Sequence, residues 1–267
     1  MKKGDLEDMV KESKYNLREA LAFRGASVLE DKKSVFVGTG LPIIASMLAQ
    51  RTHAPGLFIV FEAGGLGPQI PELPVSVGES RTYFKAIAAS SMHDVMSLSQ
   101  AGYMDFGFLG AAQMDMYGNI NTTVIGDHDL PKVRLPGSGG ANDVASFSQK
   151  LIIIVASQSK RTFVNQVDFL TTPGYLDGPG GRERAGLPEK SGPYRVITQL
   201  GIYGFDEKTK RLILISLNQG VTIADIKENS SFEIIIPGKV GISPEPTEEH
   251  LRILREEIDP AGIVLGK

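Results

Sequence analysis

The sequence predicts an α/β fold: an open, mainly parallel sheet flanked by helices, with an antiparallel hairpin at one edge. Short apolar runs alternate with segments of helical pattern, which is typical of parallel sheets. Leu57–Phe61 is wholly apolar and combines Val and Ile with aromatic residues, as expected of a strand buried on both faces. Arg195–Phe205 and Arg211–Leu217 flank the polar turn Asp206–Lys210, which predicts the hairpin.

Composition narrows the class of protein. The 267 residues show no internal repeat or linker, so we expect a single domain over residues 1–267. The net charge of −3, without a basic cluster among aromatics, argues against nucleic acid as a partner. No apolar run approaches the roughly 20 residues of a membrane helix, and the N-terminus lacks the apolar core of a signal peptide. Cysteine is absent, which excludes thiolate chemistry and disulfides and fits a cytoplasmic enzyme.

The first half of the chain follows a strand–turn–helix order. Residues 1 to about 30 are charged with spaced apolar positions, which predicts a surface helix. Ser34–Val37 is a short strand that runs through Gly38–Gly40 into a helix, Leu41–Arg51. The Gly-x-Gly turn lacks the third glycine of a dinucleotide fingerprint, so a tight βα turn is favoured over a nicotinamide site. Gly67–Gly78 holds three prolines and is expected to be an extended loop.

The later elements continue the alternation. The last expected helix is Thr247–Ile258, with Thr247 as its N-cap and Asp259-Pro260 ending it. The pattern predicts a helix His93–Gln100, a strand Asp105–Ala112, a turn Tyr117–Asn121, a helix Val144–Gln149, a strand Leu151–Val155 and a helix Thr247–Ile258.

A carboxylate stands at the end of the most buried strand. Glu62 follows Phe61 directly, and Gly64 and Gly65 allow a tight turn after it. In open α/β sheets the ligand crevice lies outside the carboxyl ends of the strands, so Glu62 is a candidate for chemistry. The alternatives are a helix N-cap or a solvated loop charge.

A glycine-rich loop precedes the expected helix at Val144. Gly137-Ser-Gly-Gly-Ala-Asn-Asp143 exposes backbone N–H groups that could hold a phosphate or an oxyanion. The alternative is a plain turn in which Asn142 or Asp143 caps the helix. Ser138 does not have the Gly-x-Ser-x-Gly setting of a hydrolase nucleophile.

Two further polar stretches leave alternatives open. Asp127-His128-Asp129 offers metal ligands, but consecutive residues seldom converge on one ion, and a solvated loop is favoured. In Gly178–Arg184, Arg182 and Arg184 could meet phosphates, or pair with Glu183 or a partner chain.

Seven ordered motifs carry a resemblance to a known family. Over Leu21 to Ile258 the chain resembles the B (beta) subunit of glutaconate CoA-transferase, a class I CoA-transferase. It departs from that protein at Ala63, where serine is expected, and over Gly65–Ile70. The motifs are Val37-Gly-Thr-Gly-Leu-Pro42, Glu62 with Gly64, Ser76-Val-Gly78, Gly118-Asn-Ile-Asn121, Gly137-Ser-Gly-Gly-Ala-Asn142, Gly178-Pro-Gly-Gly-Arg-Glu-Arg184 and Arg255-Glu-Glu-Ile-Asp-Pro260.

The resemblance implies a covalent mechanism. Glu62 would be the nucleophile that attacks an acyl-CoA, forming a mixed anhydride and then a glutamyl-CoA thioester. Gly137, Gly139, Gly140 and Ala141 would line the oxyanion and substrate site. Coenzyme A would be a co-substrate, with no permanently bound cofactor and no metal.

The resemblance also implies a partner. A homologous alpha subunit would complete a hetero-oligomer, in the simplest case two-plus-two, with the site near the subunit interface. The acids exchanged, glutaconate or another, are not fixed by the motifs. Alternatives are a subunit of a related acyl-CoA decarboxylase or hydrolase, or a non-catalytic supporting subunit. The presence of Glu62 favours transfer.

Overall fold

The computed structural model describes residues 14–266. These residues form two compact units. The first unit contains the described residues up to Met92 together with those from Pro244 onward, and the second contains His93–Ser243. The expectation of a single domain over residues 1–267 stays a prediction.

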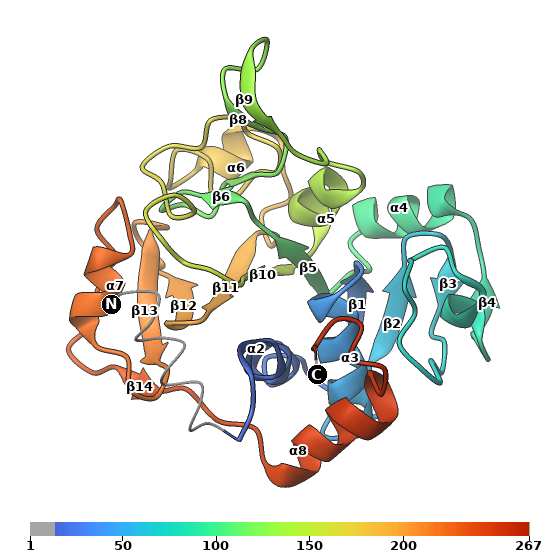
Figure 1. Cartoon of the computed structure of the whole chain (residues 1–267). Coiled ribbons are helices and arrows are strands. Elements are labelled where there is room, and N and C mark those ends of the chain that lie inside the picture. The colour runs from blue at the N-terminus through green and yellow to red at the C-terminus, as the bar shows by residue number, and fades with distance from the viewer. Residues whose placement is uncertain (1–13, 267) are drawn as a thin grey trace. The chain divides into compact units, whose positions relative to one another are not determined.

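The first unit contains four strands in the order β1-β2-β3-β4 (Figure 1). Strands β1 and β2 are parallel, with Val37 paired to Phe61, and β3 and β4 continue in antiparallel pairs. The predicted loop Gly67–Gly78 contains no helix or strand, as its prolines require. The strands are β1 (Ser34–Val37), β2 (Phe58–Phe61), β3 (Gly65–Leu66) and β4 (Ala88–Ala89).

Helices α2 (Leu17–Ala26) and α3 (Leu41–Arg51) lie side by side in this unit (Figure 1). The prediction of a surface helix before residue 30 was wrong, because every residue from Glu19 to Ala26 is buried. This helix packs against α3. Residues 1–13, also part of that prediction, lie outside the described residues. The unit also contains the 3₁₀ turn η1 (Ser80–Tyr83), the helix α8 (Glu248–Arg252), capped by Thr247 as predicted, and the π-helical turn η2 (Ile253–Ile258).

The main sheet of the second unit contains six strands in the order β14-β13-β12-β11-β10-β5. Strands β5, β10 and β11 pair in parallel. Strands β11, β12 and β13 pair antiparallel, and β14 joins β13 in parallel at the edge. The predicted fold class, mainly parallel strands flanked by helices with antiparallel strands beside them, is confirmed. The strands are β5 (Phe106–Gly110), β10 (Lys150–Val155), β11 (Pro193–Thr198), β12 (Gly201–Phe205), β13 (Leu212–Leu217) and β14 (Gly241–Ile242).

The predicted strand Arg195–Phe205 is two antiparallel strands, β11 and β12. The hydroxyl of Thr198 accepts hydrogen bonds from the backbone N–H groups of Leu200 (3.0 Å) and Gly201 (3.3 Å). This side chain builds the turn between the two strands. The predicted hairpin around Asp206–Lys210 is formed by β12 and β13, and β11 adds a third antiparallel strand before it.

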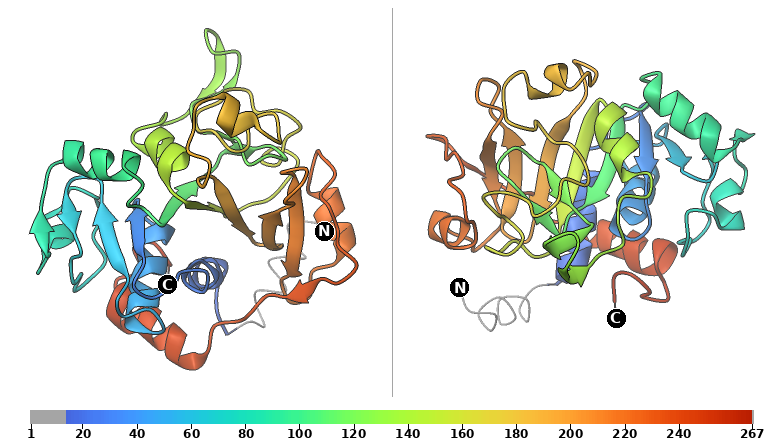
Figure 2. Two further views of the ribbon diagram at one scale, coloured as in Figure 1. Left: turned by 180° about the vertical axis from the view of Figure 1, so that it is seen from behind. Right: turned by 90° about the horizontal axis from the view of Figure 1, so that it is seen from above.

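Smaller elements surround this sheet. The hairpin of β8 and β9 extends beyond the neighbouring loops of the second unit (Figures 1 and 2), and the exposed residues 127–129 form its tip, as expected of a solvated loop. Within residues 14–266, no helix has the length and apolar character to cross a membrane. The remaining elements are α4 (Met92–Gln100), β6 (Gln113–Met114), β7 (Ile120–Asn121), β8 (Val124–Gly126), β9 (Pro131–Arg134), α5 (Ala141–Phe147), α6 (Gly181–Arg184) and α7 (Ile223–Glu228).

Candidate active site

Glu62 lies in a tight turn directly after β2. The N–H of Gly64 donates to the carbonyl of Phe61 (3.0 Å), which closes a four-residue turn with Glu62 at its second position. The turn leads into β3, so Glu62 caps no helix. Its side chain is half-buried, and among residues 14–266 it forms no hydrogen bond or ion pair. The carboxylate is thus held at a strand end with its oxygens uncommitted within the chain.

Only glycine fits at position 64. Its φ is +116°, and a Cβ built there would lie 2.0 Å from the carbonyl oxygen of Ser90. Ser90 in turn donates its backbone N–H to the Gly64 carbonyl (2.9 Å). The close approach of these two backbones fixes the chain immediately after Glu62.

The turn Gly38–Gly40 lies at the same edge of the first unit's strands. Because Val37 pairs with Phe61 in parallel register, Gly38 and Glu62 both follow that pair. Gly40 has φ +78° and precedes α3 directly. The stretch is a tight βα turn, as the missing third glycine indicated.

The glycine-rich loop presents two uncommitted backbone amides. The N–H of Gly137 donates to the backbone carbonyl of Thr122 (2.8 Å), and the N–H of Ala141 donates to that of Ser138 (2.9 Å). The N–H groups of Gly139 and Gly140, in contrast, have no hydrogen-bond acceptor in the described part of the chain. Gly139 has φ +49°, and a Cβ there would meet nothing within 4 Å. The amides of Gly139 and Gly140 are therefore the two in this loop that remain available within the described chain.

Side chains support this loop without capping α5. Gly140 is the N-cap, so the alternative of a cap by Asn142 or Asp143 was wrong. The side-chain amide of Asn142 instead donates to the backbone carbonyl of Thr171 (3.2 Å), and its backbone N–H donates to the Ser138 hydroxyl (3.2 Å). The structure brings Gly137, Gly139, Gly140 and Ala141 together in one loop, whereas Glu62 belongs to the other unit.

Arg182 is buried and ties the second glycine motif to α5. Its guanidinium donates to the carbonyls of Ser146 (2.8 Å) and Gly174 (2.9 Å) and to the Ser191 hydroxyl (2.6 Å). Burial lowers the pKa of Arg182 to about 10, so the group stays charged at neutral pH. Arg184, which is exposed, pairs with Asp177 (2.6 Å). Neither Arg182 nor Arg184 pairs with Glu183, which was one of the alternatives considered from the sequence.

Replacing Arg182 by methionine should destabilise the protein by several kcal/mol. The change leaves buried carbonyl oxygens without donors, and each such loss costs about 1–3 kcal/mol. Urea unfolding measures the difference. Arg184→Met is the matched control and should cost less than about 1 kcal/mol, because exposed ion pairs contribute little. Equal losses in the two variants would contradict the anchoring role of Arg182.

A model of the coenzyme A transferase family matches residues 18–229. The chain belongs to this family. The B subunit of glutaconate CoA-transferase from Acidaminococcus fermentans is 40% identical over 255 residues, covering 92% of this chain and 93% of the relative. The B subunit of 3-oxoadipate CoA-transferase from Pseudomonas knackmussii is 39% identical over 244 residues, covering 91% and 93%.

The fold agrees with a solved member of the family. The crystal structure of glutaconate coenzyme A-transferase from Acidaminococcus fermentans matches with a TM-score of 0.90 and 37% identity, covering 95% of this chain and 98% of that chain. These findings confirm the predicted family, fold class and CoA-transferase activity, and coenzyme A is the co-substrate. The roles of Glu62 and of the glycine loop stay predictions.

The asparagines of the Gly118–Asn121 motif have structural roles that sequence reasoning missed. The side-chain oxygen of Asn119 accepts from the backbone N–H groups of Gly174 (2.8 Å) and Leu176 (3.1 Å), and its amide donates to Asp115 (2.8 Å). Asn121 donates to the Gln113 side chain (2.7 Å). The motif holds neighbouring loops of the second unit in place, which adjacency in sequence could not show.

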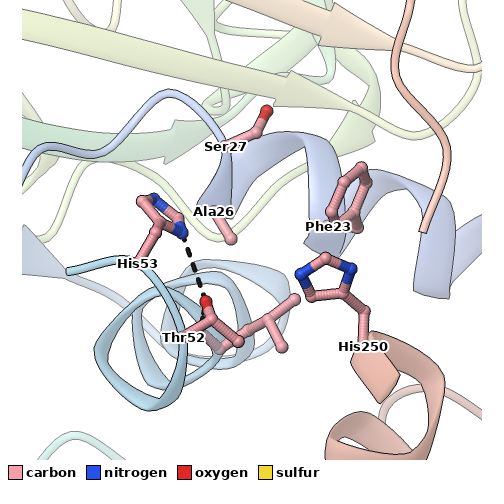
Figure 3. A pocket seen from close by; sticks show the side chains of 7 residues that line it. Phe23, Ala26, Ser27, Thr52, His53 and His250 are labelled. Atoms are coloured by element: carbon pink, nitrogen blue, oxygen red, sulfur yellow. Dashed lines mark hydrogen bonds between the residues drawn. The ribbon is translucent and has the colours of Figure 1, made fainter. Parts of the chain in front are cut away.

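A surface pocket in the first unit contains none of the predicted site residues. It has a volume of about 290 Å³ between α2, α3 and α8 (Figure 3). The ring of His250 lies against Phe23 (4.7 Å between centroids), and its Nδ1 accepts from the Thr247 N–H (3.1 Å). Burial, and then the charge of His53, lower the pKa of His250, which favours this neutral acceptor. The lining residues are Phe23, Ala26, Ser27, Leu48, Thr52, His53 and His250.

Proposed function

We propose that this chain is the beta subunit of a two-subunit enzyme that moves CoA from an acyl-CoA to an acceptor carboxylic acid through Glu62. The observation that carries the proposal is an unpaired carboxylate at the end of β2 in a member of the CoA-transferase family. Glutaconate and 3-oxoadipate, in the names of the relatives, are both dicarboxylic acids. A dicarboxylic acid is therefore the proposed substrate class.

The first half-reaction begins with attack of a Glu62 carboxylate oxygen on the thioester carbonyl carbon. The carbon–sulfur bond breaks, CoA leaves as a thiolate, and a mixed anhydride remains on Glu62. The thiolate then attacks the glutamyl carbonyl and releases the donor acid as its carboxylate. The product is a glutamyl-CoA thioester, and the acceptor acid repeats the two steps in reverse.

Each tetrahedral intermediate carries a negative oxygen. In the proposal, the N–H groups of Gly139 and Gly140 donate to it, since these amides have no acceptor in the described chain. Gly137 and Ala141, whose amides donate to the carbonyls of Thr122 and Ser138, would shape the loop rather than bind the oxyanion. A permanently bound cofactor or metal is not part of this chemistry.

The partner in the proposal is a homologous alpha subunit, in a two-plus-two assembly. Each of the two relatives is named as the B subunit of its enzyme, which supports a second kind of chain. A cytoplasmic location is also proposed, because a chain without cysteine gains nothing from an oxidising compartment.

The purified chain alone should fold yet show negligible CoA transfer, and addition of the alpha subunit should restore it. The assay follows CoA exchange between two acids, with ping-pong kinetics expected from the covalent intermediate. Decarboxylation or hydrolysis without exchange would instead indicate the related reactions. Full turnover by this chain alone, at the rate of the complex, would contradict the two-subunit proposal.

A further inference from the structure

The turn that carries Glu62 is held by a side chain from η1. Tyr83, the last residue of η1, donates its phenol hydroxyl to the backbone carbonyl of Ala63. Ala63 directly follows Glu62, so this bond fixes the peptide next to the proposed nucleophile. Among residues 14–266, no other donor to the Ala63 carbonyl is found.

The rest of the turn is fixed by backbone alone. The Gly64 N–H is bonded to Phe61 (3.0 Å), and the Gly64 carbonyl accepts from Ser90 (2.9 Å). These bonds set the two ends of the turn. The Ala63 carbonyl between them has only the hydroxyl of Tyr83 as a hydrogen-bond donor within the described residues.

Tyr83 itself starts from a well-anchored segment. Thr82 is fully buried, and its hydroxyl donates to the carbonyl of Glu79 (2.6 Å). The Thr82 carbonyl lies so near Gly65 that a Cβ on Gly65 would be 2.1 Å away. Arg81 pairs with the Glu79 side chain and donates to Leu73 (3.0 Å). The segment that carries the Tyr83 phenol is thus already packed against β3, which positions the phenol at Ala63.

We propose that Tyr83 is a positioning residue for Glu62, an inference that rests on the proposed function of Glu62 as nucleophile. The phenol neither reacts nor needs to touch the substrate. It holds the Ala63 peptide, and through it the backbone from which the Glu62 side chain extends. Covalent catalysis is sensitive to this placement, since a displacement of about 1 Å can cost about 10² in rate.

The test is Tyr83→Phe in the assembled two-subunit enzyme. Acyl-CoA is mixed with enzyme in a single turnover, and the Glu62 thioester is trapped with borohydride at increasing times. The rate of thioester formation at saturating acyl-CoA should fall by about 10- to 100-fold. The acyl-CoA concentration that gives half the maximal rate should change less than about twofold, because the phenol contributes to placement and not to binding.

Tyr15→Phe is the matched control, because Tyr15 is also half-buried in the first unit and also donates its phenol, to Glu245 (2.7 Å). It should react at the wild-type rate. Arg81→Gln is a second variant that loosens η1 without touching the turn, and it should slow thioester formation to a smaller degree. It keeps the test decisive if Tyr83→Phe fails to assemble.

Two results would overturn the proposal. A Tyr83→Phe enzyme that forms the Glu62 thioester at the wild-type rate removes the positioning role and leaves the function of Glu62 intact. A wild-type enzyme that is not labelled at Glu62 overturns the positioning role and the proposed function together. A slower Tyr83→Phe enzyme that has a lower Tm, and that regains the wild-type rate at a lower temperature, also removes the positioning role, because its loss of rate reports stability alone.

Discussion

Replacing Glu62 by alanine is expected to abolish CoA transfer in the assembled enzyme. No other residue is proposed to carry the acyl group or CoA, so the covalent route is lost with the carboxylate. Glu62→Gln, nearly isosteric but not nucleophilic, should be as inactive when fresh. The measurement is exchange of CoA between two acids with both subunits present.

Glu62→Asp separates charge from reach. It keeps the carboxylate but withdraws it by one methylene, roughly 1.5 Å. A misplacement of this size costs about 10² or more in rate, whereas a water in the vacated space can still be activated. We expect most transfer to be lost and some acyl-CoA hydrolysis to appear.

Glu248→Gln is the control for these variants. Glu248 lies in the first unit, is exposed and pairs with Lys14 (2.9 Å). Its replacement should leave transfer unchanged. Ping-pong exchange by Glu62→Ala at a rate near that of the control would show that the nucleophile is another residue.

Replacing Gly139 by valine is expected to lower turnover by about 10²–10³, the usual cost of one lost oxyanion donor. Gly139 has φ +49°, a conformation that costs a β-branched residue about 1–2 kcal/mol, so the chain relaxes and the amide moves. Gly140→Val should also lower turnover, because it crowds the second free amide. Steady-state kinetics and Tm are measured together.

Gly102→Val separates strain from function. Gly102 also has a positive φ (+83°), and a Cβ there also meets nothing within 4 Å. The two variants should lose similar stability, but only Gly139→Val should lose turnover. If both transfer CoA normally, the loop is a turn and nothing more.

The parts of the fold that the sequence predicts well are those specified locally. Ser34–Val37 and Leu41–Arg51 form the elements expected at the same bounds, because an apolar run, a glycine turn and a helical pattern each act over a few residues. The same holds for Glu62. A wholly apolar run before it and glycine after it place a carboxylate at a strand end without any knowledge of the rest of the chain.

The errors arise where distant residues decide the structure. Burial of α2 depends on packing with α3, which the charged N-terminal sequence does not show. Arg182 reads as a surface arginine in a glycine motif, yet its partners lie up to 37 residues away. Tyr83 carries no sequence signal at all, since its bond to Ala63 spans 20 residues.

The two halves of the proposed site differ in the same way. The glycine loop was recognisable, but which of its amides are free follows only from the bonds of Gly137 and Ala141. Residue types and spacing show that amides are present, and the backbone geometry shows which of them remain available. The meeting of this loop with Glu62 stays a prediction for the kinetic variants to test.

Trapping of the covalent intermediate tests the central proposal most directly. The assembled enzyme is incubated with acyl-CoA and then borohydride, which reduces a glutamyl thioester and leaves a free carboxylate unchanged, and the labelled residue is located by mass spectrometry. We predict modification at Glu62 that depends on acyl-CoA. Modification at a different residue, with Glu62 unchanged while exchange proceeds, would contradict the proposal.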